Sequence, residues 1–208
     1  MIKMIKSACN IFLAVCIGFM IISCKEQSET KTTTTATEEA AQPSKAPITV
    51  AEVNAAQQAW CDALVNIGKT HKEGGDYKAV ATAVLSDLYN YDNGKVLFKP
   101  TLAYGPQTFR LDKEGAAAYF IGGNPKYPSD NGFALTPWIK VRYDNAGGGT
   151  GVLIEGDIAM TMGNVYLTDS KGKEIIVDKT FVFKRGNDGK LRLIVHKSAL
   201  PFSPEKKS

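Results

Sequence analysis

The chain has 208 residues, of which 25 are Lys or Arg and 21 are Asp or Glu, so its formal net charge at pH 7 is +4. Such a small basic excess is not the electrostatic footprint of a nucleic-acid-binding protein. The sequence contains only two histidines, which excludes a zinc site with three histidine ligands.

The N-terminal segment, residues 1–23, has the pattern of a bacterial lipoprotein signal peptide. Lys3 and Lys6 precede an apolar run that ends in "IISC". The run is too short, and too closely followed by the polar stretch "KEQSETK", to favour a membrane-spanning helix. We predict cleavage before Cys24, lipid on that cysteine, and a protein anchored to a membrane on the periplasmic side or at the cell surface of a Gram-negative bacterium. Cleavage elsewhere, or an uncleaved anchor, is the alternative.

Residues 24–48 form the predicted tether, beginning with the lipidated cysteine. From 25 to 47 the tether has no large apolar side chain, so it cannot bury enough surface to offset the loss of chain entropy on folding. The rest, 49–204, has the size of one domain. Loss of the signal peptide and lipidation would leave Cys61 as the one thiol of the mature chain, which excludes an intrachain disulfide.

Two amphipathic helices are predicted at the start of this domain. Thr49 followed by Glu52 is a capping-box pattern, and apolar residues then recur every three or four positions until the glycine pair at 74–75. A second helix is predicted over 76–89, where "YDNG" supplies a stop and a turn.

Strands dominate the remainder of the sequence. The segment 95–104 is β-like, but Pro100 favours an edge strand or a bend. A short third helix is predicted over 112–120. From Trp138 onward the pattern is that of strands, in the stretches "WIKVRY", "GVLIEGDIAMTMGNVYLT", "KEIIVDKTFVFKR" and "KLRLIVHKSAL". The hairpin sequences "DSKGK" and "GNDGK" separate the last three.

The order of these elements predicts the fold class. Helices followed by a long antiparallel meander indicate an α+β fold, with the helices packed on one face of the sheet. A strongly curved sheet closed by N-terminal helices resembles the cone-shaped nuclear-transport-factor-2-like (NTF2-like) fold. Many unrelated functions use that cone, so the fold alone does not predict an activity.

The last predicted strand carries the first candidate site residues. Alternation assigns the even-numbered residues from Arg192 to Ser198 to one face, His196 among them, and the odd-numbered residues from Leu191 to Lys197 to the other. The first face becomes polar towards its C-terminal end, as the mouth or floor of a ligand pocket does. A histidine bonded to a backbone carbonyl at the sheet end is the alternative interpretation.

Motifs for several other chemistries are absent from the sequence. It has no C-x-x-C, no H-E-x-x-H and no glycine-rich phosphate loop between a strand and a helix. The stretch "AGGGTG" at 146–151 lies between predicted strands and is interpreted as a loop. His71 lies at a helix end in "KTHKEGG" and is expected to be exposed. Ser198 has no nucleophile-elbow motif, which disfavours Ser–His–Asp catalysis.

Six stretches taken together resemble the iota-class carbonic anhydrases. They are "VLFKPTLAYGPQTFR", "GAAAYFIGGNPKYP", "GFAL", "AMTMGNVYLTDSKG", "VDKTFVFKR" and "VHKSALPF". The resemblance covers nearly all of residues 50–202. It implies the calmodulin-kinase-association-type version of the NTF2-like cone, and an enzyme that catalyses the reversible hydration of CO2 to bicarbonate.

The same resemblance implies a set of catalytic residues. In members of the family described as metal-free, a threonine, a tyrosine and a serine hold bicarbonate in the cone, with a histidine beside the serine. The matching positions are Thr101, Tyr119, Ser198 and His196. The first three would bind bicarbonate and water, and His196 would assist proton transfer. Without the resemblance, Tyr119 and Thr101 have the pattern of ordinary core and strand residues.

The metal question stays open within the family, because other members are described as using manganese or zinc. The scarcity of histidines in this chain favours the version with no metal and no other cofactor. The family pattern "HHSSLP" reads "HKSALP" here, with Lys197 and Ala199 as the departures. Alternation places both on the face opposite His196 and Ser198, and a bulge at this point would remove that protection.

An alternative function is a non-catalytic NTF2-like module that uses the cone for a small ligand or the sheet face for oligomerisation. A cone filled by large side chains, with no cavity that reaches Tyr119, would favour it. Relatives with this cone commonly pair through the sheet, so the resemblance also implies a homodimer.

Overall fold

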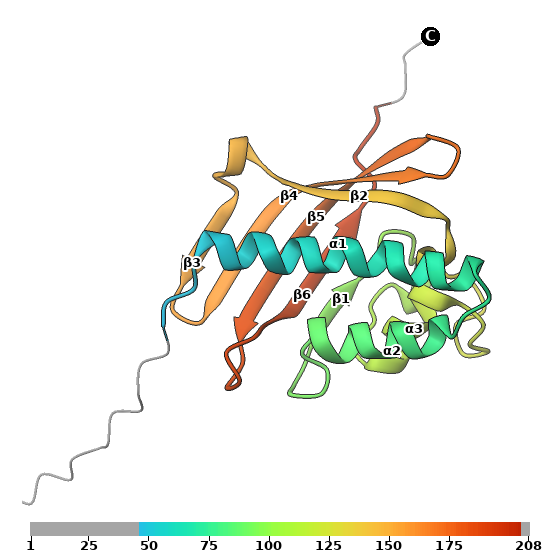
Figure 1. The fold of residues 1–208 in the computed structure, drawn as a ribbon, viewed down its shortest axis with the longest axis horizontal. Coiled ribbons are helices and arrows are strands. Elements are labelled where there is room, and N and C mark those ends of the chain that lie inside the picture. Colours follow the sequence, from blue (N-terminus) through green and yellow to red (C-terminus); the bar gives the residue numbers. More distant parts are fainter. Residues whose placement is uncertain (1–45, 205–208) are drawn as a thin grey trace, which may run out of the picture. The chain divides into compact units, whose positions relative to one another are not determined.

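The computed structural model describes residues 46–204 of the chain, drawn in colour in Figure 1. The helices are α1 (Val50–Lys72), α2 (Tyr77–Leu88) and α3 (Lys113–Ile121), with short 3₁₀ helices η1 (Gly105–Gln107), η2 (Phe133–Leu135) and η3 (Gly147–Gly149). The strands are β1 (Leu97–Lys99), β2 (Trp138–Asn145), β3 (Val152–Glu155), β4 (Ile158–Asp169), β5 (Glu174–Arg185) and β6 (Leu191–Ala199). The predicted signal peptide, the lipidation site at Cys24 and the tether as far as residue 45 lie outside the described residues.

The helices begin where the sequence predicts. Thr49 and Glu52 form the expected capping box of α1: the Glu52 backbone N–H donates to the Thr49 hydroxyl at 3.2 Å, and the Glu52 carboxylate accepts from the Thr49 N–H at 2.8 Å. Asp76 caps α2 by accepting from Ala79 N, and Asp112 caps α3 in the same way. These caps bond the backbone N–H groups that a first helical turn leaves without intrahelical acceptors.

The sheet has the strand order β1-β6-β5-β4-β2, and β3 also pairs with β4. Strands β2 to β6 are antiparallel, as predicted, whereas β1 pairs parallel to β6. The predicted antiparallel meander therefore holds from β3 to β6, whereas β2 pairs with β4 and skips its neighbour in sequence. β1 is the short edge strand expected from Pro100, which follows it directly.

One predicted strand is two strands in the structure. The stretch at 151–168 divides at a two-residue turn between β3 and β4, where Gly156 has φ +58°. This left-handed backbone conformation is easy for glycine and costly for other residues. The "AGGGTG" segment joins β2 to β3 as a loop, as expected. β2 and β3 pair with different parts of β4.

The helices cover one face of the sheet. Figure 1 shows α1 crossing in front of the strands, with α2 and α3 beside one another below it. Gly68 allows α1 to pack closely against η2, because a Cβ there would stand 2.7 Å from the Ala134 carbonyl oxygen. Ile48 is only 5% exposed and belongs to the core, so the packed structure begins at least one residue before the predicted boundary at 49. Within residues 46–204, no helix combines the length and the apolar character needed to cross a bilayer.

Candidate active site

Thr101, Tyr119 and Ser198 converge on the covered face of the sheet, and we call them the hydroxyl cluster. The Thr101 and Ser198 hydroxyl oxygens lie 2.6 Å apart, and the Tyr119 hydroxyl accepts from the Leu102 backbone N–H at 3.4 Å. Ser198 is fully buried, while Tyr119 is 5% and Thr101 9% exposed. Three residues that the family resemblance selected, from three separate segments, therefore share one buried site.

The parallel pairing of β1 with β6 explains this convergence. Lys99, the last residue of β1, lies opposite Lys197. Thr101 follows two residues after this last pair, and its hydroxyl lies within hydrogen-bond distance of the Ser198 hydroxyl on the neighbouring strand. The Lys99 ammonium group donates to the carbonyl oxygens of both Thr101 and Ser198, at 3.3 and 3.0 Å. This lysine fastens the end of β1 to β6 and so holds the two hydroxyls together.

The Tyr119 hydroxyl stays protonated over the physiological pH range. Burial raises its pKa to about 12, although its hydrogen bond with Thr101 opposes the rise. The ring packs edge-on against Phe98 and is stacked on Phe133. The rigid, neutral phenol can therefore donate a hydrogen bond to an oxygen that gains negative charge.

His196 lies on the same face but belongs to a different set of contacts. Its Nδ1 lies 2.9 Å from the Tyr89 hydroxyl, and its Nε2 lies 3.0 Å from the Lys179 Nζ. The imidazole is stacked on Phe98, with 4.4 Å between ring centroids. Burial, and then the nearby charge of Lys179, hold the pKa of His196 well below its usual value. The imidazole is therefore neutral at pH 7, and partners other than Ser198 occupy both of its nitrogens.

Trp60, Tyr89, His196 and Lys179 form one buried row of hydrogen bonds, which we call the nitrogen chain. The Trp60 indole N–H donates to the Tyr89 hydroxyl at 2.9 Å, and the row continues through His196 to Lys179. None of Trp60, Tyr89 and Lys179 is among the site residues predicted from the sequence. The alternation of "VDKTFVF" on β5 is the signal that was available, because it places Lys179 on the apolar face with Val177 and Phe181.

Lys179 is the buried amine at the end of this row. It is 4% exposed, and burial lowers its pKa to about 7. Its Nζ lies 4.2 Å from the centroid of the Trp60 ring. A cation–π contact of this kind stabilises an ammonium group by about 0.5–2 kcal/mol, whereas taking an ammonium out of water costs several kcal/mol. Desolvation therefore prevails, and the neutral amine is readily populated near neutral pH.

The alternation predicted for β6 is correct at one end of the strand and wrong at the other. Lys197 is exposed and Ala199 is half-buried on the face away from His196 and Ser198. A bulge lies upstream, because Val182 pairs with Val195 whereas Phe183 pairs with Leu193. The extra residue, Ile194, shifts the alternation by one.

Because of the bulge, the prediction that Arg192 and Ile194 lie on the same face as His196 is wrong. Leu193 is the fully buried residue there, and the Arg192 side chain forms an ion pair with Asp188 at 2.6 Å. Because the bulge precedes His196, the departures at Lys197 and Ala199 remain outside the site. The second histidine, His71, is exposed as expected.

Comparisons with known proteins identify the family. Residues 51–200 match the family model described as metal-independent carbonic anhydrase. A metal-independent carbonic anhydrase from Nostoc sp. is 50% identical over 157 residues, which cover 74% of this chain and 75% of that protein. The chain belongs to the metal-independent carbonic anhydrases.

Solved structures agree with this family. The crystal structure of an iota-carbonic anhydrase from a cyanobacterium, complexed with bicarbonate, is 49% identical to this chain, with a TM-score of 0.73; the match covers 76% of this chain and 95% of that one. An NTF2-like superfamily protein from Salmonella enterica is a distant match, with 10% identity and a TM-score of 0.46 over 76% of this chain and 96% of that one. The predicted carbonic anhydrase class is confirmed, and so is the α+β fold with helices packed on one face of a largely antiparallel sheet.

Metal independence is a property of the family to which the chain belongs. In the part of the chain that the structure describes, no group of three or more His, Cys, Asp or Glu residues has an arrangement suited to a metal ion. The hydroxyl cluster and the nitrogen chain of this metal-independent carbonic anhydrase are both built from buried polar side chains.

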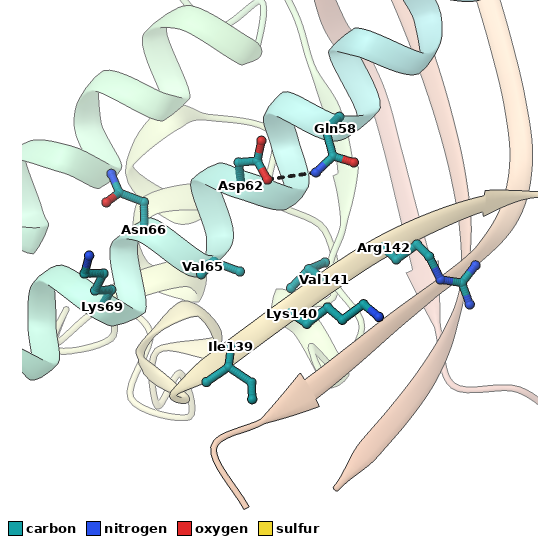
Figure 2. Close-up of a pocket in the computed structure, with 9 residues that line it drawn as sticks. All are labelled: Gln58, Asp62, Val65, Asn66, Lys69, Ile139, Lys140, Val141 and Arg142. Carbon is teal, nitrogen blue, oxygen red and sulfur yellow. Dashed lines mark hydrogen bonds between the residues drawn. The ribbon is translucent and has the colours of Figure 1, made fainter. Parts of the chain in front are cut away.

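A wide groove lies elsewhere on the enzyme and is separate from both groups. It has a volume of about 490 Å³ and runs between α1 and β2 (Figure 2). Its lining residues are Gln58, Asp62, Val65, Asn66, Lys69, Ile139, Lys140, Val141 and Arg142. Figure 2 shows the Gln58 amide bonded to the Asp62 carboxylate on its helix side. Since none of the predicted site residues lines it, this groove is not the candidate active site.

Proposed function

We propose that this enzyme hydrates CO2 at the hydroxyl cluster, with Thr101, Tyr119 and Ser198 binding bicarbonate and the attacking water. The observation that carries the proposal is the convergence of these three buried hydroxyls from β6, α3 and the segment after β1. The bicarbonate complex of the cyanobacterial relative supports a bicarbonate site in the same cone.

The chemistry requires a water molecule to lose a proton while its oxygen bonds to the carbon of CO2. A metal ion usually supplies this activation, by lowering the pKa of bound water from about 15.7 to about 7. In the hydroxyl cluster the Thr101–Ser198 pair offers both a donor and an acceptor, and so can orient the water. Tyr119 is a neutral donor for the oxygen that becomes negative. Fixed donors of this kind stabilise the transition state without a reorganisation of solvent.

Stopped-flow measurement of CO2 hydration by the full chain tests this function directly. We expect catalysis that is unchanged after treatment with a strong chelator. The absence of catalysis both before and after chelation would exclude the enzyme, and activity that is lost with chelator and restored by manganese or zinc would exclude the metal-independent mechanism.

We further propose that the protein is a lipoprotein, tethered to a membrane through Cys24. The support is the sequence "IISC" after a short apolar run with two preceding lysines. The carbonic anhydrase would then act at the periplasmic or cell-surface side. Mass spectrometry of protein expressed in a Gram-negative host should find diacylglycerol on Cys24, and Cys24→Ser should release the protein from the membrane fraction. An unmodified Cys24 would exclude the anchor.

We also infer that two copies pair through the sheet face that the helices leave open. An apolar row crosses five strands on this face, because strand pairing aligns Leu97, Val195, Val182, Met160 and Leu153 in succession. Leu97 is 55% and Leu153 53% exposed. Such a continuous apolar row on an uncovered sheet suits a self-complementary interface.

Sedimentation analysis tests the dimer. The unaltered chain should sediment as a dimer, and Val182→Asp should shift it to monomer by placing a charge in the middle of the row. Thr82→Asp adds the same charge on the exposed side of α2 and should leave the dimer intact. A chain that is monomeric at all concentrations would exclude this interface.

A further inference from the structure

The direction of the hydrogen bonds in the nitrogen chain can be worked out from its fixed end. The indole N–H of Trp60 can only donate, so the Tyr89 oxygen accepts at that contact. The Tyr89 hydroxyl proton then requires an acceptor of its own. Tyr89 is fully buried, and the acceptor beside it is Nδ1 of His196, at 2.9 Å. The Tyr89 O–H therefore donates to His196, and Nδ1 carries no proton.

The protonation state of Lys179 follows from the tautomer of His196. A neutral imidazole without a proton on Nδ1 carries it on Nε2. That N–H faces Nζ of Lys179 at 3.0 Å, so Nζ must offer a lone pair. An ammonium group has none. With an ammonium at Lys179, Nε2 would have to accept, Nδ1–H would face Tyr89, and the buried Tyr89 proton would lose its acceptor.

The surroundings of Lys179 agree with a neutral amine. Its Nζ lies over the Trp60 and Phe181 rings, and among residues 46–204 its hydrogen-bond partner is His196 rather than a carboxylate. Cys61 on α1 is the other nearby titratable group, and burial raises the pKa of its thiol to about 11, so it is uncharged. Tyr143 of β2 donates to the Lys179 backbone carbonyl at 3.1 Å, so its hydrogen bond is to the backbone and not to the amine. Burial lowers the pKa of Lys179 to about 7.

The backbone of Lys179 lies beside the hydroxyl cluster. Lys179 and Ser198 are direct partners in the pairing of β5 with β6, and both side chains are buried on the same face. Opposite residues in an antiparallel pair have Cβ atoms about 5 Å apart. The amine and the proposed substrate site are therefore neighbours in the sheet, although they belong to separate hydrogen-bonded groups.

We propose that Lys179 is a positioning residue, kept as a neutral amine that accepts the Nε2–H of His196, and that it stores the proton released when water adds to CO2. This inference rests on the proposed CO2 hydration. As the water oxygen bonds to carbon, one O–H bond breaks and its proton goes to the Tyr89 oxygen, because Tyr119 of the hydroxyl cluster lies close enough to Tyr89 to interact with it electrostatically. Tyr89 passes its own proton to Nδ1, and Nε2 passes its proton to Nζ. Tyr89 and His196 end uncharged, His196 changes tautomer, and Lys179 alone becomes positive.

Nitrogen-15 NMR of the full chain tests the resting state without any use of activity. The sequence has only two histidines, so His71→Gln assigns the His196 signals. At pH 8.5 we expect the Nε2–H tautomer of His196 together with a neutral-amine shift for Lys179. Lowering the pH through 7 should convert Lys179 to ammonium and move the imidazole proton to Nδ1. An ammonium at Lys179 at pH 8.5, or an Nδ1–H tautomer of His196, would overturn the proposal even if the chain hydrates CO2.

Kinetics of Lys179→Met test the storage step. Methionine keeps the length and apolar body of the side chain but takes up no proton. We expect kcat for hydration at pH 8 to fall at least tenfold with little change in KM, and the inflection near pH 7 in the rate profile to disappear. Lys184→Met, at an exposed position on the same strand, should leave both unchanged. A folded Lys179→Met enzyme with an unaltered pH profile would contradict the proposal, whereas an inactive unaltered chain would instead contradict the proposed function.

Discussion

The hydroxyl cluster and the nitrogen chain lie next to each other on one face of the sheet and differ in what they can do. The hydroxyl cluster contains alcohols and a phenol, and the pKa of Tyr119 is raised to about 12, so it does not titrate near pH 7. The nitrogen chain contains a lysine whose pKa is lowered to about 7. His196 and Ser198 are two positions apart on β6, yet they belong to different groups. In the two proposals above, hydrogen bonding to the substrate and proton storage therefore belong to separate residues.

Ser198→Ala should have the largest effect, because it removes a member of the hydroxyl cluster and leaves the nitrogen chain intact. We expect kcat/KM for hydration to fall about 100-fold, equivalent to about 2.7 kcal/mol of transition-state stabilisation. Stopped-flow kinetics measure this, with the folded state checked by circular dichroism. Ser170→Ala makes the same change at an exposed turn and should have no effect. A Ser198→Ala enzyme with normal rates would remove the hydroxyl cluster from the mechanism.

Tyr89→Phe should instead weaken the fold. The Trp60 N–H and the His196 Nδ1 would both lose their partner, and each unpaired buried polar group costs about 1–3 kcal/mol. Urea denaturation should show a loss of about 2 kcal/mol or more in the free energy of unfolding. Tyr104→Phe, at a position that is 72% exposed, is the matched control. An unchanged stability would mean that the hydrogen bonds of Tyr89 are not formed in solution.

The dependence of stability on pH should reveal the buried amine. The unfolded chain keeps Lys179 protonated up to about pH 10.4, whereas burial lowers the pKa in the folded state to about 7. Between pH 7 and 8.5 the unfolded state therefore binds more protons, and stability should rise with pH by about 1–2 kcal/mol. The raised pKa of Cys61 opposes this trend only at higher pH. In Lys179→Met the rise should vanish; an equal rise in the variant would assign it to another group.

Restoration of the family pattern at Lys197 and Ala199 should have the smallest effect. Both residues lie on the face away from the hydroxyl cluster and the nitrogen chain. The double substitution Lys197→His and Ala199→Ser should change kcat/KM by less than about twofold. A larger gain in the same stopped-flow assay would show that the outer face of β6 contributes to the reaction.

Much of the fold could be predicted from the sequence, because local interactions determine it. The capping box at Thr49 and the hairpin turns before β5 and β6 depend on neighbouring residues. The turn at Gly156 was missed because a glycine followed by an aspartate within an apolar run is a weak signal. The position of the hydroxyl cluster was implied by the family resemblance rather than by residue spacing.

What only the tertiary structure decided is which groups touch. His196 forms hydrogen bonds with Tyr89 and Lys179, which lie 107 and 17 positions away in the sequence. No local pattern connects these residues. The bulge at Ile194 depends on the register between β5 and β6, and the meeting of Thr101 with Ser198 depends on the parallel pairing of β1. Alternation assigns a residue to a face of a strand, whereas hydrogen bonds and pKa shifts arise from distances between segments that only the packed chain brings together.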